Sequence, residues 1–99
     1  MSEAGIKHDD GKPRWDLVQP LALEEYVAVL THGAAKYGDN NWQRVERAES
    51  RYFAACLRHL WAWRRGETAD PESGRHPLAH AMCCLAFLLE RELLERKSP

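Results

Sequence analysis

Five basic side chains in this 99-residue chain stand within short polar segments: Lys7, Lys12, Arg14, Lys36 and Arg58. Lysine and arginine neutralise phosphate groups and donate hydrogen bonds to their oxygens. Two of the segments also contain Gly or Pro, which fix the backbone shape but bury little apolar surface. The pattern therefore predicts a phosphate-binding pocket. It leaves open whether that pocket also hydrolyses what it binds.

The first segment runs from Lys7 to Arg14 and is followed directly by Trp15. Two lysines and an arginine within eight residues could fold over a nucleotide and neutralise its phosphates. A solvated, charged tail would have the same composition. The adjacent His8 and Asp9 lack the further ligands that an HD-type metal site needs.

The second segment spans residues 35–42. Lys36 could reach a phosphate, Tyr37 or Trp42 could stack on a base, and Asn41 or the asparagine before it could bind a base edge or ribose. The same residues are also typical of a helix that ends at Gly38, followed by an Asx turn and an aromatic anchor.

Histidines and carboxylates gather in the second half of the chain. We expect His76 and His80 to share a helix face because they are four residues apart, and His59 follows Arg58 directly. Together with Glu67, Asp70 and Glu72 they supply groups that bind a divalent ion or move a proton. A polar patch between helices, with Arg58 neutralised by Asp70 or Glu72, is the alternative. Glu67 and Asp70 have the spacing of a helical carboxylate pair, although Gly66 and Pro71 flank them.

The three cysteines are Cys56 and the adjacent pair Cys83 and Cys84. Their odd number and the absence of a C-x-x-C spacing argue against a disulfide framework and against a zinc site. We interpret them as small buried hydrophobic residues.

The net charge of −1 gives no overall attraction to nucleic acid polymers or to an anionic membrane. No apolar run is long enough to span a membrane, and no signal segment precedes the helices, so we expect a cytoplasmic protein. A small three-helix unit would struggle to cover its bulky apolar side chains, which predicts a homo-oligomer. These side chains are Trp42, Phe53, Trp61, Trp63 and Phe87.

The chain is predicted to be all-α, with a polar N-terminal arm (residues 1–19) that contributes to the pocket and a single helical nucleotide-binding domain (residues 20–99). The first helix should begin at Pro20, end near Lys36 and stop at Gly38. The second should have Ser50 as its N-cap and end before Gly66. The third should begin at Pro77. We expect the three helices to assemble into a larger bundle between chains.

Taken together, these segments resemble the phage dATP/dGTP diphosphohydrolase N-terminal family, which is similar in style to the all-α MazG-like nucleotide pyrophosphohydrolases. The resemblance covers residues 5 to about 90. The ordered motifs are Gly5-x-Lys7-x-Asp9-x-Gly11-Lys12-x-Arg14, Gly33-Ala34-x-Lys36-Tyr37-Gly38-x-x-Asn41-Trp42, Arg58-His59, Gly66-Glu67, Asp70-x-Glu72-Ser73-Gly74 and His76-x-x-x-His80-Ala81.

The resemblance implies binding of a purine deoxynucleoside triphosphate and its hydrolysis to the monophosphate and pyrophosphate, with Mg²⁺ or Mn²⁺ as cofactor. The implied ligand-binding residues are Lys7, Lys12, Arg14, Lys36, Tyr37, Asn41, Trp42 and Arg58. The implied metal ligands are Glu67, Asp70, Glu72 and His76, and the implied catalytic residues are His59, Glu72 and His80. If the chain is phage-encoded, it would act in the cytoplasm of the host cell.

The sequence departs from the MazG pattern at one point, because Ala28 stands where a third glutamate would follow Glu24 and Glu25. A full carboxylate cluster therefore cannot form from one chain in the usual way. Because the cations of this short chain are scattered over an arm and two helices, we expect the pocket to lie near a subunit boundary. The alternative function is a non-catalytic protein that sequesters a nucleotide, for instance a cyclic or ADP-ribose-derived immune signal of a bacterial host. A purely structural helical module would leave the five basic residues unexplained.

Overall fold

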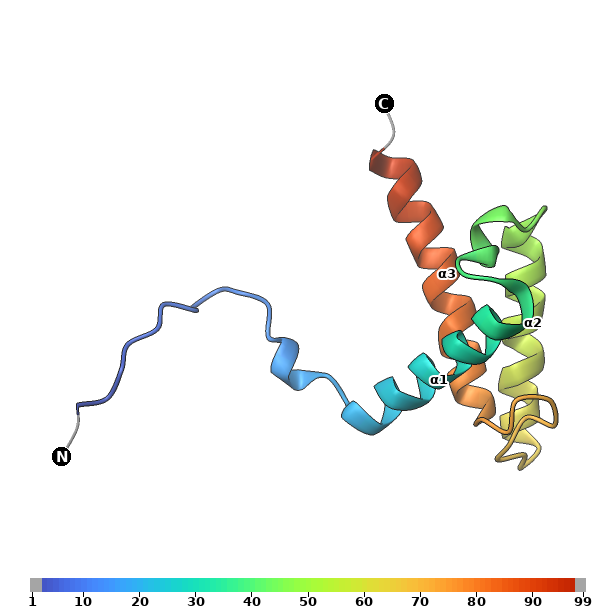
Figure 1. The fold of residues 1–99 in the computed structure, drawn as a ribbon, viewed down its shortest axis with the longest axis horizontal. Helices are drawn as coiled ribbons and strands as arrows, with labels where there is room; N and C mark the ends of the chain where they lie inside the picture. The colour runs from blue at the N-terminus through green and yellow to red at the C-terminus, as the bar shows by residue number, and fades with distance from the viewer. Residues whose placement is uncertain (1–2, 98–99) are drawn as a thin grey trace.

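The computed structural model of the chain describes residues 3–97, so the outermost residues of the two predicted ranges, 1–2 and 98–99, lie outside it. It contains three α-helices, α1 (Pro20–Tyr37), α2 (Ala48–Arg64) and α3 (Pro77–Lys97), and no strand within the described residues (Figure 1). Two 3₁₀ turns, η1 (Trp15–Leu17) and η2 (Asn41–Arg44), precede α1 and α2. The all-α prediction with three main helices is confirmed.

The helix ends follow the proline and glycine signals more closely than the serine signal. Pro20 opens α1, and Gly38 ends it with a φ of +94°, its amide donating to the Ala34 carbonyl oxygen. The predicted N-cap at Ser50 is wrong. The first helical hydrogen bond of α2 already runs from the Arg51 amide to the Arg47 carbonyl oxygen, and Ser50 lies inside the first turn.

Helix α3 packs against both other helices and has its larger contact with α2 (Figure 1). Its buried side chains are small, which lets the helix backbones approach closely. The two buried clusters consist of Val29, Ala79 and Cys83 on the α1 side and of Cys56, Ala81 and Cys84 on the α2 side.

All three cysteines are free and buried, which confirms their interpretation as small core residues. The Cys56 thiol donates to the Ala81 carbonyl oxygen across the contact between α2 and α3, and the Cys83 thiol donates to the Tyr26 carbonyl oxygen across the contact with α1. Burial raises the pKa of Cys83 to about 12 and that of Cys84 to about 11. Thiols with such pKa values are poor nucleophiles at neutral pH.

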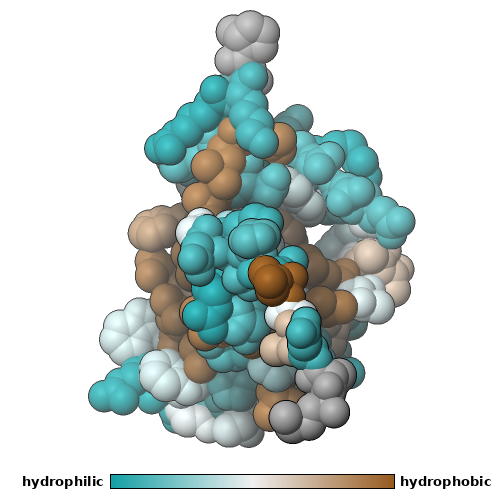
Figure 2. Space-filling model, turned by 90° about the vertical axis from the view of Figure 1, so that its left-hand side faces the viewer, coloured by the Kyte–Doolittle hydropathy of each residue, from teal (hydrophilic) through white to brown (hydrophobic). Residues whose placement is uncertain are grey.

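Much apolar surface stays in contact with water. Phe53, Trp61 and Trp63 are exposed as predicted, whereas Trp42 and Phe87 stack on each other and are half-buried. The accessible surface is 8395 Å², while a compact monomer of 11.4 kDa exposes about 5,800 Å². Viewed from the side of the arm, apolar side chains reach the surface beside the largely hydrophilic N-terminal segment (Figure 2).

The arm, as residues 3–19 are called below, runs away from the helices (Figure 1). Its hydrogen bonds stay within the arm or reach only the first turn of α1. Within it, Arg14 forms a two-pronged ion pair with Asp16, and the Lys12 amide donates to the Asp9 carbonyl oxygen. None of the helices in residues 3–97 combines the length and the apolarity needed to cross a lipid bilayer.

Candidate functional site

An open groove of about 930 Å³ lies between α1, the connection through η2, α2, the loop of residues 70–75 and α3. It brings together most of the residues that the sequence marked for ligand binding or catalysis. Those that line it are Lys36, Tyr37, Asn41, Trp42, Arg58, His59, Asp70, Glu72 and His80.

One part of the groove is aromatic. Trp42 stacks on Phe87 with 5.1 Å between ring centroids and 7° between planes, and Tyr52 meets Phe87 edge-on at 5.2 Å. All three rings line the groove. Nothing in the sequence marked Tyr52 or Phe87 as more than apolar helix residues, because their alignment with Trp42 depends on how α2 and α3 pack. The parallel Trp42–Phe87 pair in this aromatic wall suits a planar base.

The polar part of the groove is built on the loop of residues 70–75, which is held by hydrogen bonds between its own residues. The Asp70 carboxylate accepts hydrogen bonds of 3.0 Å from the backbone amides of Glu72 and Ser73. The Asp70 backbone also pairs with Arg75 and Gly74, and Gly74 has a φ of +74°. Burial acts to raise the pKa of Asp70, but the two amide hydrogen bonds outweigh it, and the pKa lies below its usual value. Asp70 is therefore ionised at neutral pH and holds the loop in shape.

Two histidines adjoin this loop. His80 Nε2 lies 2.6 Å from the Ser73 hydroxyl oxygen and 3.9 Å from an Asp70 carboxylate oxygen. The His59 ring stacks on the His80 ring at 4.7 Å between centroids. Desolvation lowers the pKa of both histidines, and the neighbouring His80 lowers that of His59 further. Both imidazoles are therefore neutral at pH 7 and able to accept a proton. Ser73 was present in the motifs but was not predicted as a site residue.

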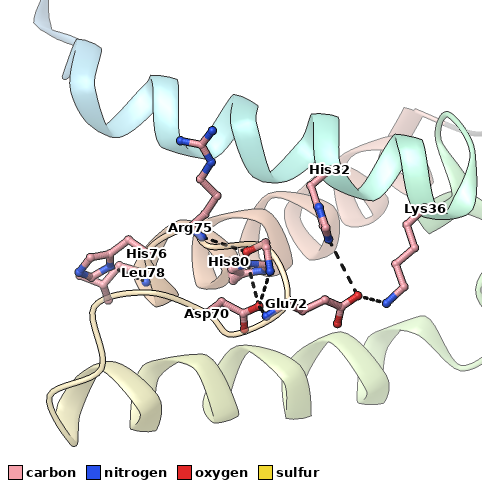
Figure 3. A network of polar contacts seen from close by, with 9 residues as sticks. His32, Lys36, Asp70, Glu72, Arg75, His76, Leu78 and His80 are labelled. Atoms are coloured by element: carbon pink, nitrogen blue, oxygen red, sulfur yellow. Dashed lines mark hydrogen bonds and ion pairs between the residues drawn. The ribbon is translucent and has the colours of Figure 1, made fainter.

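Helix α1 supplies the opposite wall. Lys36 forms an ion pair with Glu72, and His32 Nε2 lies 3.9 Å from the same Glu72 oxygen (Figure 3). The hydrogen bond with Glu72 is the main cause that raises the pKa of Lys36, and the same bond lowers the pKa of Glu72. The Lys36 ammonium also lies 4.9 Å from the Tyr37 ring centroid. His32, one helical turn before Lys36, was not singled out from the sequence.

Five of the predicted residues do not line this groove. Lys7, Lys12 and Arg14 lie on the arm, where Lys12 and Arg14 border a separate hollow formed by the arm itself. Glu67 pairs with Arg65 at 3.2 Å. His76 precedes the first residue of α3, its Nδ1 accepts from the Leu78 amide, and its ring points away from Asp70 and His80 (Figure 3).

One prediction about spacing is thereby wrong. His76 and His80 do not share a helix face, because α3 begins at Pro77 and leaves His76 outside it. Glu67 and Asp70 are not a helical pair, because α2 ends at Arg64, before the flanking Gly66. Arg58 lines the groove, but none of the ion pairs between described residues joins it to Asp70 or Glu72.

The predicted magnesium ligands do not fit a metal ion as one chain arranges them. The Asp70 carboxylate is held by two amides, Glu72 by Lys36 and Glu67 by Arg65. Across residues 3–97, no three His, Cys, Asp or Glu side chains converge as metal ligands would. Magnesium prefers several oxygen ligands in octahedral geometry, and this donor set does not supply them.

The chain is therefore an all-α protein whose groove joins an aromatic wall to a cluster of basic, imidazole and carboxylate groups. Its sequence matches the family described as dATP/dGTP diphosphohydrolase, N-terminal, over residues 2–98. It is also 38% identical over 84 residues to a protein named dATP/dGTP diphosphohydrolase from Salmonella phage PMBT28. That match covers 85% of this chain but only 28% of the phage protein. No solved structure matches the chain.

This chain belongs to the dATP/dGTP diphosphohydrolase N-terminal family. The resemblance inferred from the ordered motifs is confirmed. Because the chain spans less than a third of the phage relative, the activity named for that whole protein is carried over to this chain only as a proposal.

Proposed function

We propose that this chain is a phage-type nucleotide pyrophosphohydrolase that binds a purine deoxynucleoside triphosphate in the groove and hydrolyses it to the monophosphate and pyrophosphate. The observation that carries the proposal is the groove itself. A planar aromatic wall and two cations, Lys36 and Arg58, line one continuous surface in a chain of this family.

The aromatic wall is where the base would bind. A purine stacked against Trp42 would extend the parallel Trp42–Phe87 pair, and Asn41 beside it offers an amide to the base edge or the sugar. The phosphates would then face Lys36 and Arg58. Lys36 must leave Glu72 to reach them, which exchanges one ion pair for another.

Hydrolysis requires a group that takes a proton from the attacking water. The neutral imidazoles of His59 and His80 are the candidates, since their lowered pKa values leave them unprotonated at pH 7. His80 Nε2 is engaged with Ser73, and the hydroxyl of Ser73 in turn accepts from the Arg75 amide. This chain of hydrogen bonds fixes the orientation of the His80 ring, so we assign His59 as the general base and His80 as the residue that positions it.

The experiment is to incubate the purified protein with dATP and dGTP, with and without Mg²⁺ or Mn²⁺, and to measure pyrophosphate and monophosphate. Arg58→Ala should lower binding and turnover strongly. Arg64→Ala at the end of α2 is the matched control, because Arg64 is an exposed arginine on the same helix that does not line the groove. Absence of product from all common nucleotides, under every metal condition, would refute hydrolysis. Metal dependence stays a prediction that the same assay tests.

The second candidate is a protein that binds a nucleotide without cleaving it, for example a cyclic or ADP-ribose-derived signal of a bacterial host. The arrangement of Asp70, Glu72 and Glu67 favours it, because each carboxylate is engaged by a protein donor and the three do not converge on one point as metal ligands would. Tight binding without metal, with the ligand recovered intact by mass spectrometry, would support this candidate. Recovery of a cleaved product would exclude it. Action in the host cytoplasm stays a prediction for both candidates.

A further inference from the structure

The arm exposes bulky apolar side chains to water. The exposed fractions are 84% for Ile6, 81% for Trp15, 62% for Leu17 and 77% for Leu21 at the start of α1. Local hydrogen bonds nevertheless give the arm a defined shape, including the 3₁₀ turn η1 and the Arg14–Asp16 ion pair. A shaped segment with an aromatic and several aliphatic side chains in solvent is typical of a surface that binds a protein.

The groove, in contrast, is short of positive charge for a triphosphate ligand. Its lining includes two cationic side chains, Lys36 and Arg58. Four carboxylates line it as well, namely Asp39, Asp70, Glu72 and Glu90. Lys36 is further neutralised by its ion pair with Glu72. A ligand with several phosphate charges needs more cations than one groove provides.

The missing cations are on the arm, which in its own chain points away from the groove (Figure 1). Lys7, Lys12 and Arg14 all lie within its described residues. The open surface is also large enough for a dimer. The accessible surface of 8395 Å² exceeds that of a compact monomer by far more than the roughly 800 Å² that each partner buries in a standard interface.

We propose that two copies of this chain exchange their arms. The arm of each copy lies across the groove of the other copy and against exposed apolar side chains of its α3, such as Leu85 and Leu89. Trp15 and Leu17 anchor it there, and Lys12 and Arg14 complete the partner's phosphate site. In a two-fold dimer the same contact is made twice, so each copy both buries its own arm and receives the arm of the other. The supply of cations to a nucleotide rests on the function proposed above, whereas the exchange of arms does not.

The first test uses the ligand-free protein. The mass in solution is measured by light scattering after size-exclusion chromatography over a range of concentrations. The double variant Trp15→Ala/Leu17→Ala should raise the dimer dissociation constant by well over about a hundredfold, because one buried side chain of this size accounts for roughly that factor and both arms of the dimer lose two. Its helix content by circular dichroism should be unchanged, because both side chains are exposed in the monomer.

A matched variant, Trp61→Ala, removes a tryptophan that is 61% exposed on α2 and not part of the arm. It should leave the dissociation constant nearly unchanged. A monomeric wild-type protein, or a dimer weakened by Trp61→Ala but not by the arm variant, would overturn the exchange of arms.

The second test mixes Lys12→Ala with Arg58→Ala, after each has been shown to bind dGTP weakly. With exchanged arms, random dimers contain an intact arm on an intact groove in roughly a quarter of all sites. The mixture should therefore recover about a quarter of wild-type binding. No recovery, with a wild-type protein that binds dGTP, would overturn the shared site. If the wild type binds no nucleotide, the proposed function fails, and the mass measurement still decides whether the arms exchange.

Discussion

The arm and the loop of residues 70–75 have similar compositions but opposite structural roles. Both are polar, and both contain glycine, proline, aspartate and a basic residue. In the loop, the Asp70 carboxylate and backbone bind Glu72, Ser73, Gly74 and Arg75, and Ser73 connects the loop to His80 on α3. In the arm, hydrogen bonds join near neighbours in sequence. Composition therefore indicates a possible binding segment in both cases. Only the loop is tied to a helix, and this contact makes it a fixed wall of the site.

The largest difference between the two segments should appear on removal of an aspartate. Asp70→Ala removes the acceptor of the exposed Glu72 amide and of the partly buried Ser73 amide, and it removes the carboxylate beside His80, so we expect a loss of about 2 kcal/mol in the free energy of unfolding. Asp10→Ala in the exposed arm should cost close to nothing. Urea unfolding followed by circular dichroism measures both. Equal effects of the two substitutions would mean that the loop is not held by Asp70.

A smaller effect is expected from pH, because His59 and His80 are only partly buried. Their pKa values in the folded protein lie below the ordinary 6.5, so the unfolded chain binds more protons in this range. The free energy of unfolding should therefore fall as pH drops below about 6.5, well above the range in which Asp70 titrates.

The control for this pH dependence compares a histidine of the site with one of the arm. His80→Gln should flatten the decline between pH 7 and about pH 5, and His8→Gln should leave it as in the wild type. A decline that is as steep in His80→Gln and in His59→Gln as in the wild type would show that other groups cause it.

Glycines with positive φ offer a further matched pair. Gly74 in the loop has a φ of +74° and Gly11 in the arm a φ of +79°, and a Cβ at either would meet no neighbouring atom within 4 Å. Any cost of alanine is therefore conformational. Gly74→Ala should lower the free energy of unfolding by about 1 kcal/mol, because the hydrogen-bonded loop enforces this conformation. Gly11→Ala should have little effect on the unfolding curve, because the arm can relax. A cost at Gly11 as large as at Gly74 would show that the arm is held as firmly as the loop.

The smallest change in stability is expected at the ion pairs. Glu72→Gln breaks the exposed pair with Lys36, and Asp16→Asn breaks the exposed pair with Arg14. Each should change the free energy of unfolding very little, because both pairs are exposed to water, which screens the attraction. Only Glu72→Gln frees a cation of the groove, so binding of dGTP without metal, measured by calorimetry, should strengthen a few-fold in that variant. Weaker binding would indicate that Glu72 itself contacts the ligand.

The helices could be predicted from sequence because their signals are local. Pro20 and Pro77 set the starts of α1 and α3, and Gly38 sets the end of α1. The predicted N-cap at Ser50 was wrong because a serine can equally lie in the first turn of a helix. There the Ser50 hydroxyl donates to the Arg47 carbonyl oxygen. The presence of N-cap chemistry does not fix the register of a helix.

The site was harder to predict because its contacts join distant parts of the chain. Lys36 and Glu72 are 36 residues apart, and only the packing of α1 against α3 shows that they meet. Lys36 was predicted to bind phosphate and Glu72 to bind a metal ion, but in the structure they form an ion pair with each other. Four further site residues could not be predicted either, because each is also typical of an ordinary helix or turn and only the packing of distant segments brings it to the site. These residues are His32, Tyr52, Ser73 and Phe87.

A buried cysteine can be used to measure how often the helices of this protein separate. Cys56 and Cys84 are buried where α2 meets α3, and Cys83 is buried where α3 meets α1. Cys83 and Cys84 line the groove, whereas Cys56 does not, so a thiol reagent such as iodoacetamide can reach Cys56 only when α2 and α3 separate. The rate of alkylation at Cys56, measured by mass spectrometry of its peptide, therefore follows the separation of these helices without a dye or a tag. One new cysteine placed on the arm would react at once and could be labelled selectively in the folded protein.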